Sequence, residues 1–293
     1  MPHTNHATPM IKHYLQVTKP GIIFGNIFTA AGGFAVAAHG HIDPFLLLTT
    51  LIAVSLVIAS SCVFNNYIDR DIDALMERTK NRELVIGAIR PAAALLYAGM
   101  LGGTGFFLLW HYTTVLTVGV ALAAVFAYVV LYSLIFKRTE WGTYVGSISG
   151  AAPPVIGYCA AGGQLDGGAL LLFLILCLWQ VPHFYAITMY LVDDYAKAKI
   201  PVLPITDGMR ATKIHIVGYI IAFIGATILF TSLRYAGYLF LVVAVVLGLW
   251  WLQLAWSGFS ATDDKKWAKS VFLRSLLVMM LAFGTMTLER VIF

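Results

Sequence analysis

Charged residues are scarce in this chain. Asp, Glu, Lys and Arg together make up 11% of its 293 residues, whereas about 25% is usual for a soluble globular domain. The sequence therefore lacks the polar surface that a water-soluble protein of this length needs. Its basic residues, which give a formal net charge of +5, are spread over short segments between apolar runs, so no nucleic-acid-binding domain is predicted.

Cysteine is also rare. Cys62, Cys159 and Cys177 lie inside apolar runs, and none of them belongs to a C-x-x-C pair. Neither a disulfide framework nor a zinc site is therefore indicated. The first apolar run is not followed by a convincing small-residue cleavage site, so we expect no cleaved signal peptide.

Long apolar runs are what the sequence has in abundance. Hydrophobic residues make up 60% of it, and its mean hydropathy is +0.83. Segments of about 18–22 apolar residues can cross a bilayer as helices. We predict a single all-α integral membrane domain over residues 1–293, with about nine spans. The predicted spans are 20–38, 46–66, 92–110, 114–136, 143–161, 168–189, 214–232, 236–256 and 271–288.

The fifth predicted span is less regular than the others. It is rich in glycine and contains Pro153 and Pro154. Small residues allow close helix packing, and proline kinks a membrane helix. The segment is therefore expected either to form a packing seam or to line a substrate site.

The distribution of lysine and arginine predicts the orientation. When the N-terminal tail, residues 1–19, is placed in the cytoplasm, all but two of the 19 basic residues fall on the cytoplasmic side, the exceptions being Arg234 and Arg290. This is a strong positive-inside bias. It places the N-terminus and both acidic clusters described below in the cytoplasm.

A charged stretch, FNNYIDRDIDALMERTKNR, directly follows the second apolar run. Asn65, Asp69 and Asp73 recur at intervals of four, which places them on one face of a helix. Three oxygen-bearing side chains on one face suit a hard cation such as Mg2+. Arg78 and Arg82 follow, again four apart, and can bind phosphate oxygens. The pattern predicts a site that holds a diphosphate through a bridging metal ion.

A second polar cluster, Asp193, Asp194, Lys197 and Lys199, follows the sixth predicted span. Four spans separate it from the first cluster, and an even number of crossings returns the chain to the same side of the membrane. The two clusters can therefore face each other across one cavity. The alternative for the first cluster is that it is only a solvated helix end stabilised by i,i+4 ion pairs.

Aromatic residues near the two clusters suit the chemistry of an allylic diphosphate. Metal ions and basic side chains stabilise the departing diphosphate, and aromatic faces can shield the cation that is left. The aromatic residues near the clusters are Phe64, Tyr67, Trp179, Phe184, Tyr185, Tyr190 and Tyr195. Because aromatic residues are also common at membrane interfaces, their position alone assigns no single ring.

Five segments together resemble the UbiA superfamily of intramembrane prenyltransferases. They are KPGIIFGN, NNYIDRDIDALMERTKNR, GTYVGSISGAAPPVIGY, WQVPHFYAI and DYAKAKIPVLP. The resemblance covers about residues 12–285 and is closest to the bacterial members that farnesylate heme. It implies nine helices around a central cavity, a location in the bacterial inner membrane, Mg2+ as cofactor, and farnesyl diphosphate and heme B as substrates. Heme-handling or terminal-oxidase assembly proteins are the implied protein contacts, in addition to the lipid bilayer.

The resemblance also implies roles for individual residues. The implied metal ligands are Asn65, Asp69, Asp73 and Asp194. The implied diphosphate-binding residues are Asn65, Arg78, Arg82, Lys197 and Lys199. The implied catalytic residues are Asp69, Asp73, Asp194, His183 and Tyr195.

Two positions depart from the family pattern. The second acidic motif of the superfamily is usually D-x-x-x-D, but the residue four positions after Asp193 is Lys197. A second complete metal site is therefore doubtful, and we favour Asp194, which directly precedes Tyr195, as the remaining metal-binding or water-orienting carboxylate. Glu83 stands where many relatives have proline, at a position expected to be peripheral.

His183 lies within the sixth predicted span, directly after Pro182. A histidine inside a span is costly unless it is paired or faces a cavity. Its expected role is to ligate heme iron, or to act as a base or orienting group near the vinyl carbon. The alternative is a hydrogen-bonded packing residue beside a proline-loosened helix.

Three other functions remain open from the sequence. A prenyltransferase that acts on an aromatic quinone precursor would share the Asn/Asp/Arg pattern, although WQVPHF favours heme. A cation-coupled transporter usually places its charges near the membrane midplane, whereas the acidic residues here lie at the ends of spans. A heme-binding assembly factor would leave the first polar cluster unexplained.

Overall fold

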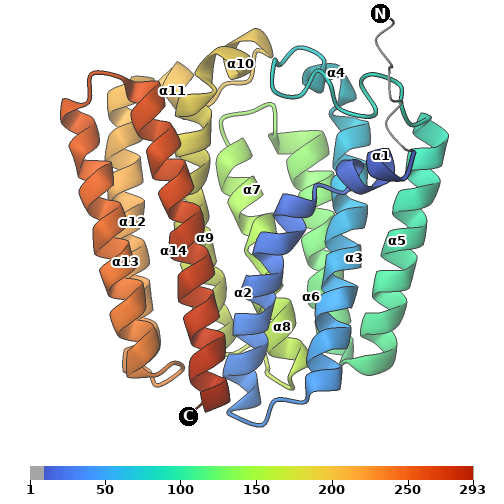
Figure 1. Ribbon diagram of the computed structural model, residues 1–293, viewed down its shortest axis with the longest axis vertical. Coiled ribbons are helices and arrows are strands. Elements are labelled where there is room, and N and C mark those ends of the chain that lie inside the picture. The colour runs from blue at the N-terminus through green and yellow to red at the C-terminus, as the bar shows by residue number, and fades with distance from the viewer. Residues whose placement is uncertain (1–9, 293) are drawn as a thin grey trace, which may run out of the picture.

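The computed structural model describes residues 10–292, and every regular element in that range is a helix (Figure 1). Eight of the helices are long and apolar enough to cross a membrane. They are α2 (Pro20–Ala38), α3 (Pro44–Ile68), α5 (Pro91–Tyr112), α6 with the π-helix η1 (Val115–Phe136), α9 (Gly167–Tyr190), α12 (Gly208–Ser232), α13 (Tyr238–Ser257) and α14 (Asp264–Ile292). The prediction of an all-α membrane protein is confirmed.

The fifth predicted span is broken into two helices of nine residues each, α7 (Gly142–Gly150) and α8 (Ala152–Ala160). The break at Ala151 has a local cause, because Pro153 and Pro154 lack the N–H groups that would continue the hydrogen bonds of α7. Proline is well suited to the first turn of α8, where those N–H groups would be unpaired anyway. With this split segment, the eight long helices make nine crossings, so α1 and the end of α14 lie at opposite ends (Figure 1).

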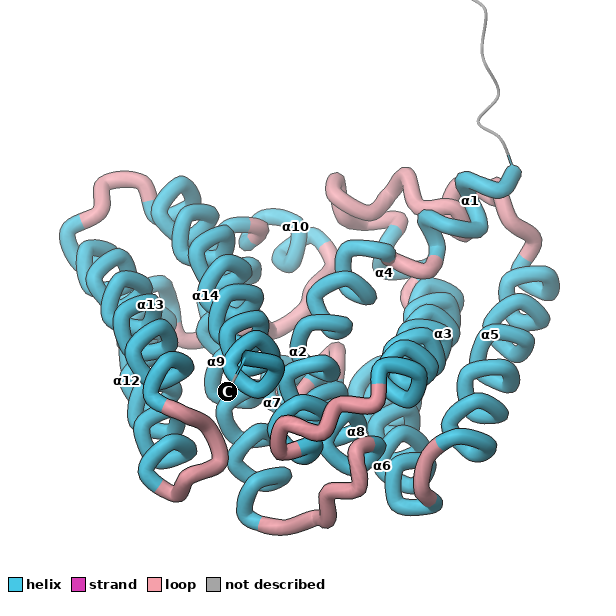
Figure 2. Tube along the Cα trace, turned by 60° about the horizontal axis from the view of Figure 1, so that its bottom comes forward, coloured by secondary structure: helices cyan, strands magenta, loops and turns pink. Residues whose placement is uncertain are grey.

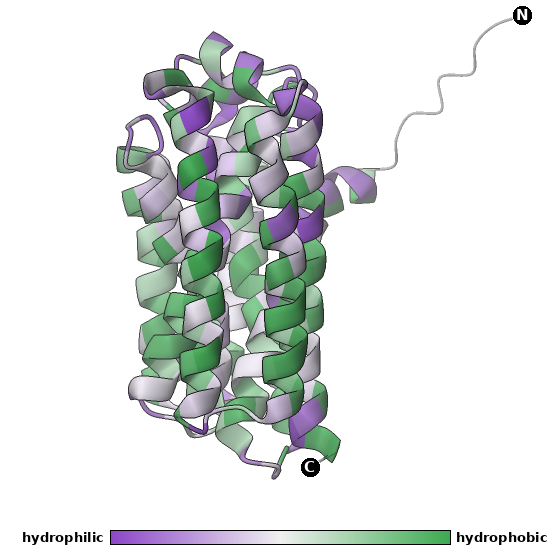
Figure 3. Ribbon diagram, turned by 90° about the vertical axis from the view of Figure 1, so that its left-hand side faces the viewer, coloured by the Kyte–Doolittle hydropathy of each residue, from purple (hydrophilic) through white to green (hydrophobic). Residues whose placement is uncertain are grey.

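Four short helices gather at one end of the bundle, which we call the polar end. They are α1 (Met10–Val17), α4 (Arg70–Asp73), α10 (Val192–Lys197) and α11 (Leu203–Thr206). Figures 1 and 2 show α1, α4 and α10 on the same side of the molecule. Figure 3 shows hydrophilic residues at this end and mainly hydrophobic ones along the helices. Residues 1–9 of the predicted cytoplasmic tail lie outside the described range, and residues 10–17 form α1.

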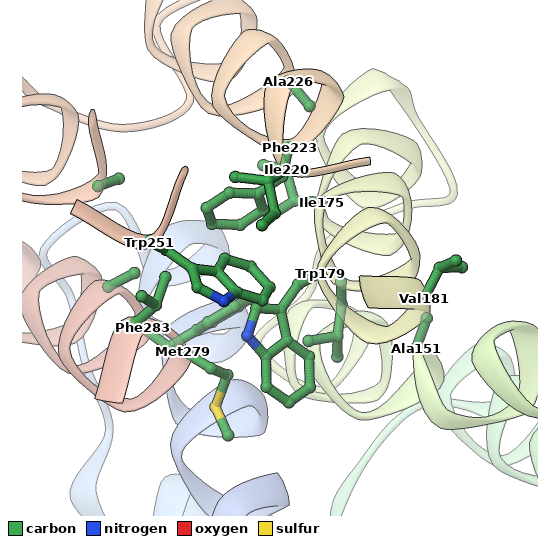
Figure 4. Packing of buried hydrophobic residues seen from close by; sticks show 14 of the residues in the cluster. Ala151, Ile175, Trp179, Val181, Ile220, Phe223, Ala226, Trp251, Met279 and Phe283 are labelled. Atoms are coloured by element: carbon green, nitrogen blue, oxygen red, sulfur yellow. The ribbon is translucent and has the colours of Figure 1, made fainter. Parts of the chain in front are cut away.

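The largest core cluster holds the C-terminal helices together. Its aromatic and aliphatic side chains come mainly from α9, α12, α13 and α14. In Figure 4, Trp179 and Trp251 lie close to Phe223 and Ile220 of α12, with Met279 of α14 beside them. Trp251 is fully buried, and its indole N–H donates to the Val271 carbonyl at 3.2 Å. This packing holds α9 against α12, α13 and α14 and so fixes the position of its side chains.

Helix α2 approaches α8 so closely that glycine is required at the contact. A Cβ atom on Gly157 would overlap the Ala30 carbonyl oxygen, and one on Gly33 would overlap the Pro154 carbonyl. Any larger side chain would push the two helices apart. The broken span is thus held against α2, and residues of both helices reach the cavity described next.

Candidate active site

A cavity of about 750 Å3 extends from the polar end into the bundle. Its lining comes from α2, α3, α5, α6 with η1, α7, α8, α9 and α14, together with Asp73 of α4 and Tyr195 of α10. Lys137 and Arg78 line it at the polar end, whereas Leu109, near the far end of α5, and Ala121 line its apolar depth. The cavity therefore joins a charged mouth to an apolar interior.

The first polar cluster lies at this mouth. Asn65, Asp73, Arg78 and Arg82 line the cavity, and Asp69 is fully buried next to them. The backbone keeps its helical bonds through the cluster, because Asp69 N donates to Asn65 O at 2.9 Å and Asp73 N donates to Asp69 O at 2.8 Å. The predicted common face of these three side chains follows from that register.

Asn65 is the centre of a buried hydrogen-bond network. Its Nδ2 donates to Asp69 Oδ2 at 2.6 Å and to Ser133 Oγ at 3.0 Å. Its Oδ1 accepts from Lys19 Nζ at 2.7 Å, while Lys137 pairs with Asp69. Because Lys19 precedes α2 and Lys137 follows η1, two other elements of the chain bring their cations to α3.

Asp73 is bonded to the loop that follows it. Arg82 Nη1 donates to Asp73 Oδ2 at 2.6 Å, and Thr79 Oγ1 donates to the Asp73 carbonyl at 2.9 Å. The Asp73 side chain is 4% exposed and that of Arg82 is 22% exposed. The loop after α4 therefore folds back over the mouth and carries both arginines to the cavity.

The mouth has more positive than negative charge. Lys19, Arg78, Arg82 and Lys137 line the cavity, against the carboxylates of Asp69 and Asp73. Burial, together with nearby Arg82, lowers the pKa of Lys19 to about 8. A buried ammonium group whose pKa is lowered in this way is stabilised when a negatively charged ligand binds beside it. The electrostatics therefore suit a phosphorylated ligand.

The donor set also fits a divalent cation. Asp69 Oδ1 is buried and accepts no hydrogen bond in the described part of the chain, which leaves an oxygen free for a hard metal ion. Residues 10–292 contain no cluster of three or more His, Cys, Asp or Glu side chains that could hold a metal. The two carboxylates of the mouth therefore need the amide oxygen of Asn65 to complete a set of three oxygen ligands.

The second polar cluster has a different environment. Asp194 is buried, and its two carboxylate oxygens accept the backbone N–H groups of Glu77 and Arg78, both at 3.2 Å. Asp193 is 70% exposed and pairs with Lys265 at 2.5 Å. The two clusters thus lie at the same end of the bundle, as predicted. They do not face each other across the cavity, because none of the four residues of the second cluster lines it, and Asp194 instead binds the backbone of the loop that follows the first cluster.

The remaining residues of the second cluster divide between cavity and surface. Tyr195 lines the cavity, and burial raises the pKa of its hydroxyl, so it stays a proton donor. Lys197 is 54% exposed and lies 3.8 Å from Glu77. Lys199 adopts a left-handed backbone conformation, with φ 54°. Neither lysine is part of the cavity lining.

His183 lines the cavity from α9. It lies beside Trp179, with ring centroids 4.7 Å apart, and its Nδ1 is 2.7 Å from Ser275 Oγ of α14. Pro182 does not interrupt α9, which continues to Tyr190. The structure thus brings His183 into the same cavity as Asn65 and Asp73.

The family model of the UbiA prenyltransferase family matches residues 26–277. The chain belongs to the UbiA prenyltransferase family. The match includes the first polar cluster, the loop after it, the broken span and the segment that carries His183 and Asp194. The transporter and assembly-factor alternatives are set aside, because family membership makes this protein a prenyltransferase.

Similar proteins support the same assignment. A protein of Chromohalobacter salexigens named "Protoheme IX farnesyltransferase" is 55% identical over 268 residues, which cover 91% of each chain. A digeranylgeranylglyceryl phosphate synthase structure has a TM-score of 0.78 at 17% identity, over 98% of this chain and all of that one. A UbiA homolog from Archaeoglobus fulgidus, bound to GPP and Mg2+, has a TM-score of 0.70 at 16% identity, over 94% and 99% of the two chains. The last two establish a shared fold.

Several residues at the polar end of the cavity could not be assigned from the sequence. Lys19 opens the KPGIIFGN segment, and Lys137 follows the fourth span, yet nothing in their spacing pairs them with Asn65 and Asp69. Tyr128 and Tyr132 line the cavity as a stacked pair with centroids 5.6 Å apart. They lie in the π-helix η1, Phe126–Phe136, a form that often occurs at functional sites.

Proposed function

We propose that this prenyltransferase transfers the farnesyl group of farnesyl diphosphate to a vinyl group of heme B, with addition of water, to give heme O. The observation that carries the proposal is the 55% identity, over 91% of both chains, to a protein named for this activity. The cavity geometry agrees, because a charged mouth suits the diphosphate and an apolar interior suits an isoprenoid chain.

The diphosphate is proposed to bind among the cations of the mouth. Arg78 and Arg82 present guanidinium groups suited to phosphate oxygens, and Lys19 and Lys137 add two ammonium groups from other elements. Mg2+ held by Asn65, Asp69 and Asp73 would supply further stabilisation of the charge on the departing diphosphate. Since Lys137 and Arg82 pair with Asp69 and Asp73, both cations are already next to the ligand position.

The proposed reaction begins with cleavage of the allylic carbon–oxygen bond. Both bonding electrons leave with the diphosphate, and the vinyl group then forms a carbon–carbon bond to the farnesyl cation. Water adds to the resulting porphyrin-side cation, and the proton it loses is taken up by the released diphosphate. The apolar walls exclude bulk water until the bond has formed, while the stacked rings of Tyr128 and Tyr132 can shield the cation.

The second cluster is proposed mainly to position the first. Asp194 accepts the backbone N–H groups of Glu77 and Arg78. Its carboxylate oxygens have further lone pairs, which could also bind a metal ion or orient a water molecule, as predicted. Tyr195 is proposed to donate its hydroxyl proton to a substrate oxygen in the cavity. The predicted diphosphate contacts of Lys197 and Lys199 would require both side chains to move from their exposed positions.

The location is proposed from the charge distribution. The polar end carries most of the basic residues and is therefore assigned to the cytoplasm of a bacterial inner membrane. This orientation gives farnesyl diphosphate access from the aqueous side and heme B access from the bilayer. Contact with heme-handling or oxidase-assembly proteins would follow from the fate of the product.

The experiment is product analysis with purified protein. Farnesyl diphosphate, heme B and Mg2+ are supplied together, and the pigments are extracted and measured by mass spectrometry. We expect a product heavier than heme B by one farnesyl group and one hydroxyl group. Reactions with 4-hydroxybenzoate in place of heme B serve as the control. Prenylation of the hydroxybenzoate with no change in heme would contradict the proposal and favour the quinone-precursor alternative.

A further inference from the structure

One nitrogen of the His183 imidazole has no hydrogen-bond partner among the described residues. The side chain is only 8% exposed, and its Nδ1 lies 2.7 Å from Ser275 Oγ. No hydrogen bond to Nε2 occurs within residues 10–292, and the residue lines the cavity. A buried polar side chain therefore has one free nitrogen at the substrate space.

The protonation of that nitrogen follows from counting hydrogens. Ser275 Oγ also lies 2.6 Å from the Phe272 carbonyl oxygen, which can only accept. The single hydroxyl proton of Ser275 is therefore donated to Phe272. Nδ1 of His183 must then carry a hydrogen and donate it to Ser275 Oγ. In the neutral ring this leaves the lone pair on Nε2.

The ring is also held in one orientation. Trp179 stacks on it at 26°, and Phe272 lies against it at 5.0 Å between centroids. The indole N–H of Trp179 donates to the Ser275 carbonyl at 2.8 Å, so α9 and α14 are joined by two hydrogen bonds around the imidazole. A donor N–H bonded to a protein oxygen and a fixed ring plane are typical of metal-ligating histidines.

The surroundings distinguish a ligand from a general base. A base at this position would become an imidazolium, which needs a carboxylate or water to stabilise it. The group behind Nδ1 is a neutral hydroxyl, and the rings of Trp179, Phe184 and Phe272 surround the imidazole. A metal ligand remains neutral, so the apolar setting favours ligation over proton transfer.

We infer that His183 Nε2 is an axial ligand to the iron of the metalloporphyrin substrate. This inference rests on the proposed function, because heme enters the argument as the acceptor of the farnesyl group. Ligation holds one face of the porphyrin against α9 and α14, within the same cavity as the diphosphate mouth. Ser275 is then a positioning residue that fixes the tautomer of the ligand.

The test is the iron–histidine stretch in the resonance Raman spectrum of purified protein loaded with ferrous heme B. We expect this band in the wild type and its loss in His183→Ala, with recovery when free imidazole is added. His215→Ala is the matched control, because His215 contacts the rings of Tyr185 and Tyr219 in the membrane helices but does not line the cavity. The control should keep the wild-type band.

Ser275→Ala tests the positioning role and does not depend on recovering the His183 variant. Without the hydroxyl acceptor, Nδ1–H loses its partner, so Nε2 becomes a weaker donor and the iron–histidine band should move to lower frequency. An unchanged band in Ser275→Ala, or a retained band in His183→Ala, would overturn the assignment. If the wild type forms heme O but lacks the band, the assignment of His183 as iron ligand is wrong while the proposed function stands. If the wild type neither binds heme nor forms heme O, the proposed function is wrong as well.

Discussion

The two polar clusters occupy equivalent places in the chain but have different environments. Both follow a membrane helix at the polar end, α3 in one case and α9 in the other. In the first, Asp69 and Asp73 are buried and paired with Lys137 and Arg82. In the second, Asp193 is exposed and pairs with Lys265 at the surface, whereas Asp194 is buried and accepts backbone N–H groups. Similar composition thus gives a buried, cation-paired cluster at the cavity in one place and a cluster outside the cavity lining in the other.

The difference has a structural cause. The helical hydrogen bonds of α3 continue through Asp69 and Asp73, so the face that lines the cavity is extended toward the polar end. Both junctions have one linking residue: α3 ends at Ile68 before α4 begins at Arg70, and α9 ends at Tyr190 before α10 begins at Val192. They differ in the backbone of that residue, because Asp69 keeps right-handed helical angles (φ −87°, ψ 0°) whereas Leu191 (φ −108°, ψ 27°) does not. Only Tyr195 of α10 reaches the cavity. The backbone at these two linking residues therefore affects which carboxylates lie beside the cavity.

The largest expected effect comes from exchanging carboxylate for amide in the first cluster. Asp73→Asn removes a negative ligand and the partner of Arg82, so turnover should fall by about 10²–10³-fold or more, as when a preorganised electrostatic group is lost. Initial rates of heme O formation measure this. Asp193→Asn, the matched exchange in the second cluster, should stay within about twofold, because exposed pairs contribute little. Equal losses in both variants would remove the distinction between the clusters.

A smaller difference is expected between two lysines. Lys137 has a side chain that is 16% exposed and pairs with Asp69, whereas that of Lys197 is 54% exposed. Loss of a hydrogen bond to a charged group costs about 1.5–3 kcal/mol. Lys137→Met should therefore lower kcat/KM for farnesyl diphosphate by roughly 10–100-fold, a range that follows from that cost. Lys197→Met should have little effect, and a larger loss there would show that Lys197 reaches the diphosphate during turnover.

The smallest of the three effects is expected from Asp194→Asn. An amide can accept through only one oxygen, so one of the backbone bonds to Glu77 and Arg78 is lost. We expect faster hydrogen exchange at these two amides and an increase of up to about tenfold in KM for farnesyl diphosphate, equivalent to one modest hydrogen bond. Unchanged exchange at both amides, combined with weaker Mg2+ binding, would instead assign Asp194 to the metal.

Much of the fold and part of the site could be predicted from the sequence. Apolar length gives the spans, and spacing by four gives the common face of Asn65, Asp69 and Asp73, because both depend on local helix geometry. The parity of the crossings also predicts that the two clusters lie at the same end of the bundle. The split of the fifth span could not be predicted from its prolines alone, since many membrane helices tolerate proline as a kink.

The remaining parts of the site depend on contacts between distant segments. Lys19 lies 46 residues from Asn65, and Lys137 lies 68 residues from Asp69, so no local pattern pairs them. The exposed positions of Lys197 and Lys199 depend on the direction taken by the chain after α9. The bond between His183 and Ser275 spans 92 residues. Such pairs become visible only when the helices are packed together.

We propose above that the first polar cluster holds a diphosphate through a bridging metal ion. Binding of a farnesyl diphosphate analogue that cannot ionise, measured on the wild-type protein with Mg2+ and with excess chelator, tests it most directly. We predict at least tenfold weaker binding after chelation, and no such metal dependence in Asp69→Asn. Equal affinity of the wild type with and without Mg2+ would contradict the claim.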